Sequence, residues 1–264
     1  MTLRLFWKLV RLLMKERMEY RGDFFLAIAA QIISYTGDYI IIWLFIQKFN
    51  HIAGWTWPEI ALLYSISLFT YALGAAFSFV QMRDLEGQVN NGTLDALLVK
   101  PVNPYLYLIC RGFNLGYIAH LVVSGSVLIW ALTALDLEWS AMQIIYLVLT
   151  IISGALIQTG ILTTIGATSF IWVRSGFLFN LFFKIKDFIS YPLPVFGTFI
   201  QILLTFVIPF AFINYYPASF LLSRDTMLLS DEVMWLVPLM GPLCCLAGYR
   251  FWMYGVNRYQ GAGG

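Results

Sequence analysis

Six long apolar stretches set the main constraint on how this 264-residue chain can fold. A helix needs about 20 mostly apolar residues to cross a bilayer, and each stretch is that long. Backbone groups inside lipid must be satisfied within a helix, and the stretches lack the alternation of a membrane β-barrel. Charged residues make up only 11% of the chain, too few for a soluble surface. We therefore expect one all-α transmembrane domain over residues 1–264, with spans at 24–46, 59–80, 112–132, 143–170, 191–212 and 233–255.

The positions of the positive charges predict that both termini are cytosolic and that the chain is a multi-pass protein of the plasma membrane. With the N-terminus inside, only Lys48 and Arg224 fall outside, which is the bias typical of such proteins. The other fourteen fall inside: Arg4, Lys8, Arg11, Lys15, Arg17, Arg21, Arg83, Lys100, Arg111, Arg174, Lys184, Lys186, Arg250 and Arg258.

The first 22 residues predict an interfacial helix. Its cations recur at helical spacing, and leucines occupy much of the remaining surface, so the helix suits a position among membrane lipids at the cytosolic interface. The alternative is that this segment is only the positively charged anchor of the first span. Residues 175–190, which mix phenylalanines with lysines, are a second interfacial candidate. The cations of the first helix are Arg4, Lys8, Arg11 and Lys15.

The longest outer loop, residues 213–232, contains the sequence NYYPASFLLSRD. Its apolar centre lies between Pro217 and Asp225 and suggests a short helix that dips back toward the membrane before the sixth span. Non-helical backbone at that depth must be buried in protein or face water.

The loop between the second and third spans predicts a short cytosolic helix. Gly92 interrupts the chain, and Thr93 is suited to cap a helix that begins at Leu94. One face of that helix is apolar, formed by Leu94, Leu97 and Leu98. An apolar face on a cytosolic loop either binds a partner surface or lies on neighbouring helices.

This loop reads RDLEG and then NGTLDALLVKPV, which resembles the ABC-2 superfamily of exporter permeases. In that family a Glu-containing stretch leads into Gly-Thr-Leu-Glu/Asp, two leucines, Pro-Val or Pro-Ile, and a basic residue that opens the third span. The corresponding residues are Glu86, Gly92, Thr93, Leu94, Asp95, Leu98, Pro101 and Arg111. The resemblance implies a second permease half, identical or related, and separate ATPase subunits. It implies contact or coupling with the ATPase through Leu85, Glu86, Gly92, Thr93, Leu94, Asp95, Leu97 and Leu98.

The family further implies that the second and fifth spans line the export path. Two mildly polar helical faces would suit an amphipathic or hydrophobic cargo, although helix packing explains such faces equally well. They comprise Tyr64, Ser67 and Tyr71 in the second span and Thr198, Gln201 and Thr205 in the fifth.

The chain contains no GxxxxGK[ST] phosphate-binding loop, so we expect ATP and Mg²⁺ to bind to the partner ATPase and this chain not to be an enzyme. We expect no catalytic residue, metal site or nucleic-acid partner, because two scattered histidines and three cysteines offer no ligand spacing. Asp38 in the first span leaves an ion-coupled secondary transporter as the alternative. Its simpler interpretation is a hydrogen bond to Tyr35, Tyr39 or a neighbouring helix, and His120 is interpreted as hydrogen-bonded across a helix interface.

Overall fold

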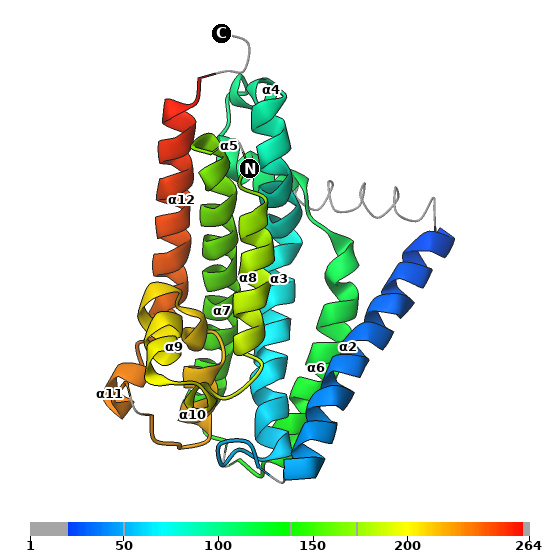
Figure 1. Cartoon of the computed structure of the whole chain (residues 1–264), viewed down its shortest axis with the longest axis vertical. Helices are drawn as coiled ribbons and strands as arrows, with labels where there is room; N and C mark the ends of the chain where they lie inside the picture. Colours follow the sequence, from blue (N-terminus) through cyan, green and yellow to red (C-terminus); the bar gives the residue numbers. More distant parts are fainter. Residues whose placement is uncertain (1–20, 50, 138, 173, 227, 261–264) are drawn as a thin grey trace.

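The computed structural model describes residues 21–49, 51–137, 139–172, 174–226 and 228–260, which form a helical bundle with no β-strand among them (Figure 1). The expected interfacial helix over residues 1–22, including Arg4, Lys8, Arg11 and Lys15, lies outside this description except for its last two residues, which begin α2. The long helices are α2 (Arg21–Phe49), α3 (Trp57–Asn90), α6 (Ile118–Ala134), α7 (Ala141–Ala167) and α12 (Met240–Arg258). The shorter ones are α4 (Asp95–Leu98), α5 (Pro104–Arg111), α8 (Phe177–Phe188), α9 (Thr198–Ile202), α10 (Tyr215–Leu221) and α11 (Asp231–Met234).

Five segments are long and apolar enough to cross a membrane, which confirms the all-α membrane architecture. They coincide with the expected first, second, third, fourth and sixth spans. A sixth segment qualifies only if a bent pair of helical pieces is counted as one span.

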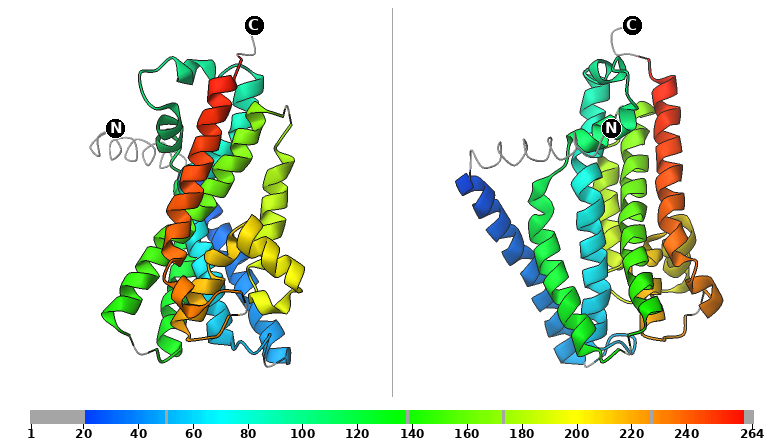
Figure 2. Two further views of the ribbon diagram at one scale, coloured as in Figure 1. Left: turned by 90° about the vertical axis from the view of Figure 1, so that its left-hand side faces the viewer. Right: turned by 180° about the vertical axis from the view of Figure 1, so that it is seen from behind.

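The centre of the bundle is formed by α3 and α7, with α12 packed on α7 and α6 packed on α3 (Figures 1 and 2). Glycines permit the closest of these contacts. A Cβ atom at Gly248 of α12 would lie 2.5 Å from the Gly160 carbonyl oxygen of α7, and one at Gly160 would lie 2.5 Å from the Cys244 carbonyl oxygen. Such close backbone approach is typical of small residues at membrane helix interfaces. The outer helix α2 leans away from the others toward the end of the bundle that carries α4, here called the α4 end (Figure 2).

The expected fifth span over residues 191–212 is wrong as a continuous helix. The pieces Thr198–Val207 and Phe210–Leu221 meet at 76° and lie at the end of the bundle opposite α4 (Figure 1). Pro192, Pro194 and Pro209 explain the breaks, because proline lacks a backbone donor and restricts the residue before it. Ile208, directly before Pro209, is accordingly extended at φ −120° and ψ 98°. Hydrophobicity alone did not reveal this interruption.

Helix α8 stands alongside α3 and α7 (Figure 1), which differs from the interpretation of residues 175–190 as an interfacial helix. Phe179 and Phe183 make edge-to-face contacts with Phe79 of α3, at 5.9 and 5.5 Å between ring centroids. This aromatic side of α8 therefore lies against the bundle rather than in the plane of the membrane surface. Its 12 residues span ~18 Å, over half of the hydrocarbon thickness.

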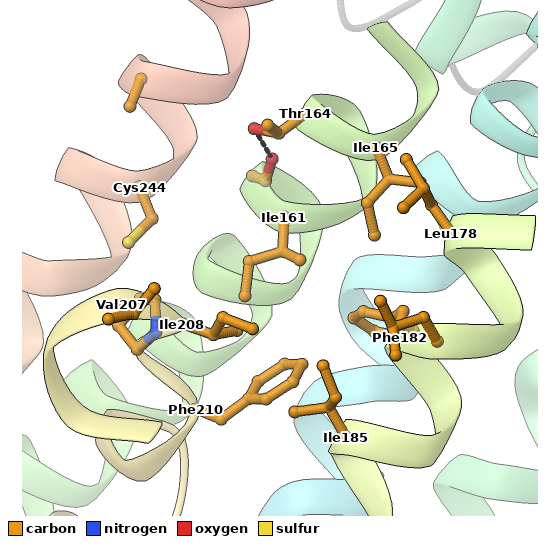
Figure 3. Close-up of a pocket in the computed structure, with 14 residues that line it drawn as sticks. Ile161, Thr164, Ile165, Leu178, Phe182, Ile185, Val207, Ile208, Phe210 and Cys244 are labelled. Atoms are coloured by element: carbon orange, nitrogen blue, oxygen red, sulfur yellow. Dashed lines mark hydrogen bonds between the residues drawn. The ribbon is translucent and has the colours of Figure 1, made fainter. Parts of the chain in front are cut away.

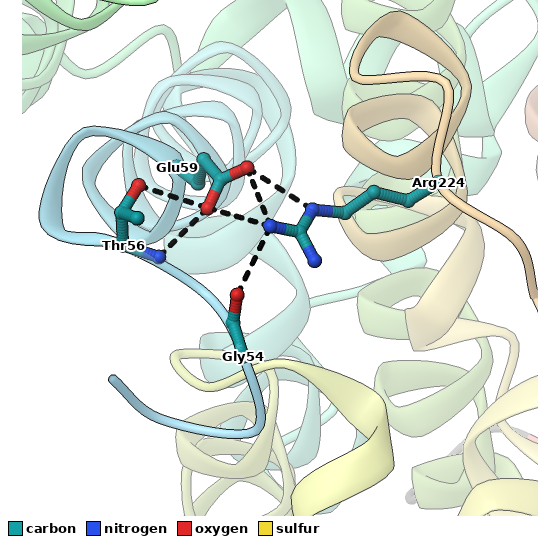
Figure 4. Close-up of polar contacts among 4 residues, drawn as sticks. All are labelled: Gly54, Thr56, Glu59 and Arg224. Carbon is teal, nitrogen blue, oxygen red and sulfur yellow. Dashed lines mark hydrogen bonds and ion pairs between the residues drawn. The ribbon is translucent and has the colours of Figure 1, made fainter.

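The short helix expected in residues 213–232 is present as α10, and its residues are almost all buried. Just after it, Arg224 forms a bidentate ion pair with Glu59 at the start of α3, with N–O distances of 2.7–3.0 Å (Figure 4). Glu59 also accepts hydrogen bonds from the Thr56 backbone and hydroxyl, and Arg224 donates to the Gly54 carbonyl. These bonds fasten the bent segment to the start of α3.

Candidate functional site

The α4 end of the bundle is built by the abrupt end of α3. Gly92 adopts φ +69°, a left-handed conformation that favours glycine, and the chain turns there into α4. Asp95 occupies the first turn of α4, as expected. Thr93 does not cap that helix: its hydroxyl donates to the Gln88 carbonyl at 3.4 Å, and the residue at the cap position is Leu94.

The leucines of this segment point into the protein. In the predicted apolar face, Leu94 is completely buried, Leu97 is 5% exposed and Leu98 is half-buried, so Leu94 and Leu97 are not available to a partner. Leu85 is also completely buried. Neighbouring helices cover them, which is the other arrangement that the sequence left open. The outward residues are Thr93, Asp95, Ala96, Val99 and Lys100, among which Val99 is 82% exposed.

Glu86 joins α3 to the start of α8. Its carboxylate accepts hydrogen bonds from the backbone N–H groups of Ser175 at 2.8 Å and Gly176 at 2.5 Å. Carboxylates are favoured at helix N-termini because the free N–H groups carry partial positive charge. Glu86 therefore links the segment leading to α4 with the start of α8.

The helix after α4 is fixed to the opposite side of the bundle. Asn103 caps α5 through the Leu106 N–H at 3.1 Å and donates to the Tyr249 hydroxyl of α12 at 2.9 Å. The Tyr105 hydroxyl lies 3.0 Å from the Thr163 hydroxyl of α7. A hydrogen bond from Lys100 lowers the pKa of the half-buried Tyr107 phenol below its ordinary value. Helix α5, which follows α4, is thus held against α7 and α12.

A polar cavity of about 400 Å³ lies between α2, α3, α6 and α8, at the level of the middle of α3. On one side the Tyr35 hydroxyl and His120 Nε2 are 2.5 Å apart, joining α2 to α6. Tyr64 of α3 donates to Asp38 of α2 at 3.3 Å. These contacts confirm the interpretation of His120 and that of Asp38 as hydrogen-bonded to a neighbouring helix.

Helix α8 forms the fourth wall of this cavity and contributes two charged residues, which the sequence predicted at the cytosolic interface. Lys186 and Asp187 of α8 both line the cavity. The Lys186 ammonium lies 4.7 Å from the centre of the Tyr71 ring, a cation–π contact. Two buried lining atoms, Gln31 Oε1 and His120 Nδ1, have no hydrogen-bond partner in the described part of the chain. The cavity therefore contains polar atoms that remain free to bond to a ligand.

A second cavity of about 410 Å³ lies on another side of α8, between α7, α12 and the turn at 207–210 (Figure 3). Its lining is apolar, with Ile161, Ile185 and Phe210 among the side chains that point into it. The hydroxyl of its one threonine, Thr164, donates to the Gly160 carbonyl within α7. Helix α8 consequently separates a polar cavity from an apolar one.

Comparison with known proteins identifies the family. A family model described as "ABC-2 family transporter protein" matches residues 32–263, nearly the whole chain. The chain belongs to the ABC-2 transporter family. This makes it the membrane component of an ABC transporter. Searches of curated proteins and of solved structures found no match.

In this ABC-2 protein the two faces proposed as a cargo path do not come together. Tyr64 and Tyr71 line the polar cavity, but Ser67 is 1% exposed and its carbonyl accepts from Gln158 of α7. The other face belongs to the bent segment. There Thr198 is exposed, Gln201 donates to the Phe196 carbonyl, and the Thr205 hydroxyl lies 3.0 Å from that of Tyr216. The broken fifth span is the reason, since it places these residues at the end opposite α4.

Sequence reasoning missed Lys186 and Asp187 as lining residues because hydropathy favoured residues 191–212 as the fifth span. The three prolines in that stretch were the available signal. It also missed the ion pair between Glu59 and Arg224. The spacing of Thr56 and Glu59 is that of a capping box, which the structure contains and which could have placed Glu59 at the start of a helix. No sequence signal indicated that Arg224 would reach Glu59.

Proposed function

We propose that this protein is the permease half of an ATP-driven exporter and that α4 is its docking point for a separate ATPase subunit. The observation that carries the proposal is the outward surface of α4. Val99, directly after α4, is 82% exposed, and the polar residues Thr93 and Asp95 of the same segment are exposed too. An exposed apolar side chain within a polar rim suits a protein partner. In this proposal the α4 end is cytosolic, and ATP and Mg²⁺ bind to the partner.

The contacts of Glu86 suggest how force from the partner reaches the membrane. A push on α4 moves the end of α3, whose Glu86 carboxylate accepts from the backbone N–H groups of Ser175 and Gly176, directly before α8. Helix α8 carries Lys186 and Asp187 into the polar cavity and forms one wall of the apolar cavity. Movement of this helix therefore changes both cavities at once, as export of an amphipathic cargo requires.

A second permease half and lipids are the proposed partners within the membrane. Helix α2 leaves large apolar side chains uncovered along its length, including Leu26 at 71% and Ile33 at 73% exposure. In a membrane such a surface contacts lipid chains or another apolar helix.

The second candidate is an ion-coupled secondary transporter, favoured by the cavity of Asp38, Asp187 and His120. Such transporters place ionisable groups near the membrane midplane. The two candidates differ in their energy source. Uptake of cargo into inverted membrane vesicles that requires ATP, and persists when ion gradients are collapsed, supports the ABC permease and excludes the alternative.

The docking surface can be tested with Val99→Asp. The variant should insert and fold normally, because Val99 is mostly exposed, but the ABC ATPase that co-purifies with the tagged wild-type protein should be lost. Ala141→Asp is the matched control, since it adds the same charge to an exposed helix end away from α4. Normal co-purification and normal ATPase stimulation with Val99→Asp would reject α4 as the docking point.

A further inference from the structure

The polar cavity between α2, α3, α6 and α8 carries an excess of negative charge. Its lining includes two negative residues, Asp38 and Asp187, and one positive residue, Lys186. With His120 neutral, the lining carries a net charge of one negative. No two of these are within ion-pair distance: the ion pair found within 4 Å in the described residues is Arg224–Glu59. Asp38 is half-buried and has no cation within ion-pair distance in the described part of the chain, and an uncompensated charge inside a membrane protein is costly, so the cavity favours an occupant that brings a positive charge.

The aromatic groups of the cavity favour the same kind of occupant. Its lining includes the rings of Tyr35, Tyr64, Tyr71 and Tyr117, and faces of such rings attract cations. Tyr71 already demonstrates this, because the Lys186 ammonium lies over its ring at 4.7 Å.

Hydrogen-bonding capacity is also left over. Gln31 Oε1 is a buried acceptor on the cavity lining with no partner among the described residues. An ammonium group is a donor without acceptor capacity and can satisfy this oxygen, whereas an anionic group cannot. Buried polar atoms in proteins are normally paired, so the unpaired oxygen points to a missing donor.

We propose that this cavity binds the singly charged ammonium head of an amphipathic cargo. The apolar part of that cargo can lie against Leu68, Phe79 and Phe183, which share the lining. The proposal rests on the proposed function as an exporter and names the class of its cargo. Asp38 provides the main charge for the ammonium, and Lys186 acts as a competing internal cation.

Equilibrium binding tests this in the absence of ATP and of the ATPase. The protein is placed in lipid nanodiscs and titrated with radiolabelled dodecylammonium or with dodecyl sulfate, which has the same chain and the opposite charge. Empty nanodiscs give the background. We expect saturable binding of dodecylammonium only. Asp38→Asn should weaken it by about tenfold or more, because a charge-assisted contact is lost. Lys186→Met should tighten it.

The control is Asp23→Asn, which removes a carboxylate from the first turn of the same helix, away from the cavity, and should leave binding unchanged. If Asp38→Asn does not fold by its thermal unfolding midpoint, Asp187→Asn replaces it, since Asp187 is exposed. Tighter binding of dodecyl sulfate, weakened by Lys186→Met, would overturn the proposal. So would the lack of saturable dodecylammonium binding to folded protein. Because ATPase docking is measured separately on the same preparation, either result leaves the exporter assignment standing.

Discussion

Helices α3 and α2 are both apolar enough to cross a membrane, but the protein holds them in different ways. In the most apolar part of α3, 83% of the residues are buried in the protein, against 11% in α2. Helix α3 lies against α7 through small residues: a Cβ atom at Gly74 would lie 2.5 Å from the Ala155 carbonyl oxygen. Helix α2 is joined by side-chain hydrogen bonds, among them Tyr35 with His120 and Asp38 with Tyr64.

This difference indicates where the molecule can move. Close packing keeps α3, α7 and α12 from sliding past one another, because packed interiors respond to small volume changes, so a displacement of α3 carries its neighbours with it. Two of the bonds that hold α2 are in the polar cavity, so a shift of α2 changes the cavity without disturbing the packed unit. Helix α8 is intermediate in how firmly it is held, because a hydrogen bond fixes each of its ends. Glu86 accepts from the Gly176 backbone at one end, and Asn214 donates to the Ile189 carbonyl at 2.6 Å at the other.

The largest effect is expected from Gly248→Leu in the packed unit. The new side chain would meet the backbone of α7 at Gly160, where nothing flexible can give way. Overpacking should cost about 1–3 kcal/mol or more and sharply reduce the yield of folded protein. The measurement is the thermal unfolding midpoint in detergent together with the recovered monodisperse fraction.

Gly37→Leu is the matched control on α2. A Cβ atom there meets nothing within 4 Å, so the variant should fold as well as the wild type. Equal loss of folded protein in both variants would show that α2 is as tightly packed as α12 and would remove the contrast between them.

An intermediate effect is expected from Glu86→Ala, which cuts the link between α3 and α8. The two backbone N–H groups are then left to water, and helix-capping changes of this kind cost about 0.5–2 kcal/mol. The protein should still fold and bind the ATPase, but cargo should no longer stimulate ATP hydrolysis. Asp84→Ala, an exposed neighbour on α3, serves as the control. Unaltered stimulation by cargo in Glu86→Ala would mean that force does not travel through this contact.

The fold was predictable from sequence where hydrophobicity and packing agree. Five of the six expected spans are helices at the expected places, because length and apolar character suffice to define a membrane helix. The prediction of a continuous helix over residues 191–212 was wrong because hydropathy does not register how prolines interrupt a helix. The prolines here are Pro192, Pro194 and Pro209. The burial of Leu94 and Leu97 was beyond the sequence, since the periodicity of a short helix identifies an apolar face but not the surface that covers it.

The candidate cavity was only partly predictable. Asp38, Tyr64, Tyr71 and His120 stood out as polar groups within apolar spans, and all four line it. Their assembly also depends on α8 lying beside α3 at the same level, which hydropathy did not indicate. The charge balance of the cavity therefore required the tertiary structure.

The smallest effect is expected from Tyr35→Phe, which removes one of the bonds that hold α2. The loss of one hydrogen bond costs about 0.5–1.5 kcal/mol, so folding and yield should remain close to the wild type. What should change is the position of α2. Spin labels at Phe25 and Ile118, both exposed, should report a broader distribution of distances between α2 and α6. Tyr254→Phe, at an exposed position of α12, controls for removal of a hydroxyl and should leave the distribution as it was. If Tyr35→Phe instead lowers the folded yield as Gly248→Leu does, the hydroxyl supports the packed unit itself, and α2 cannot be the movable wall of the cavity.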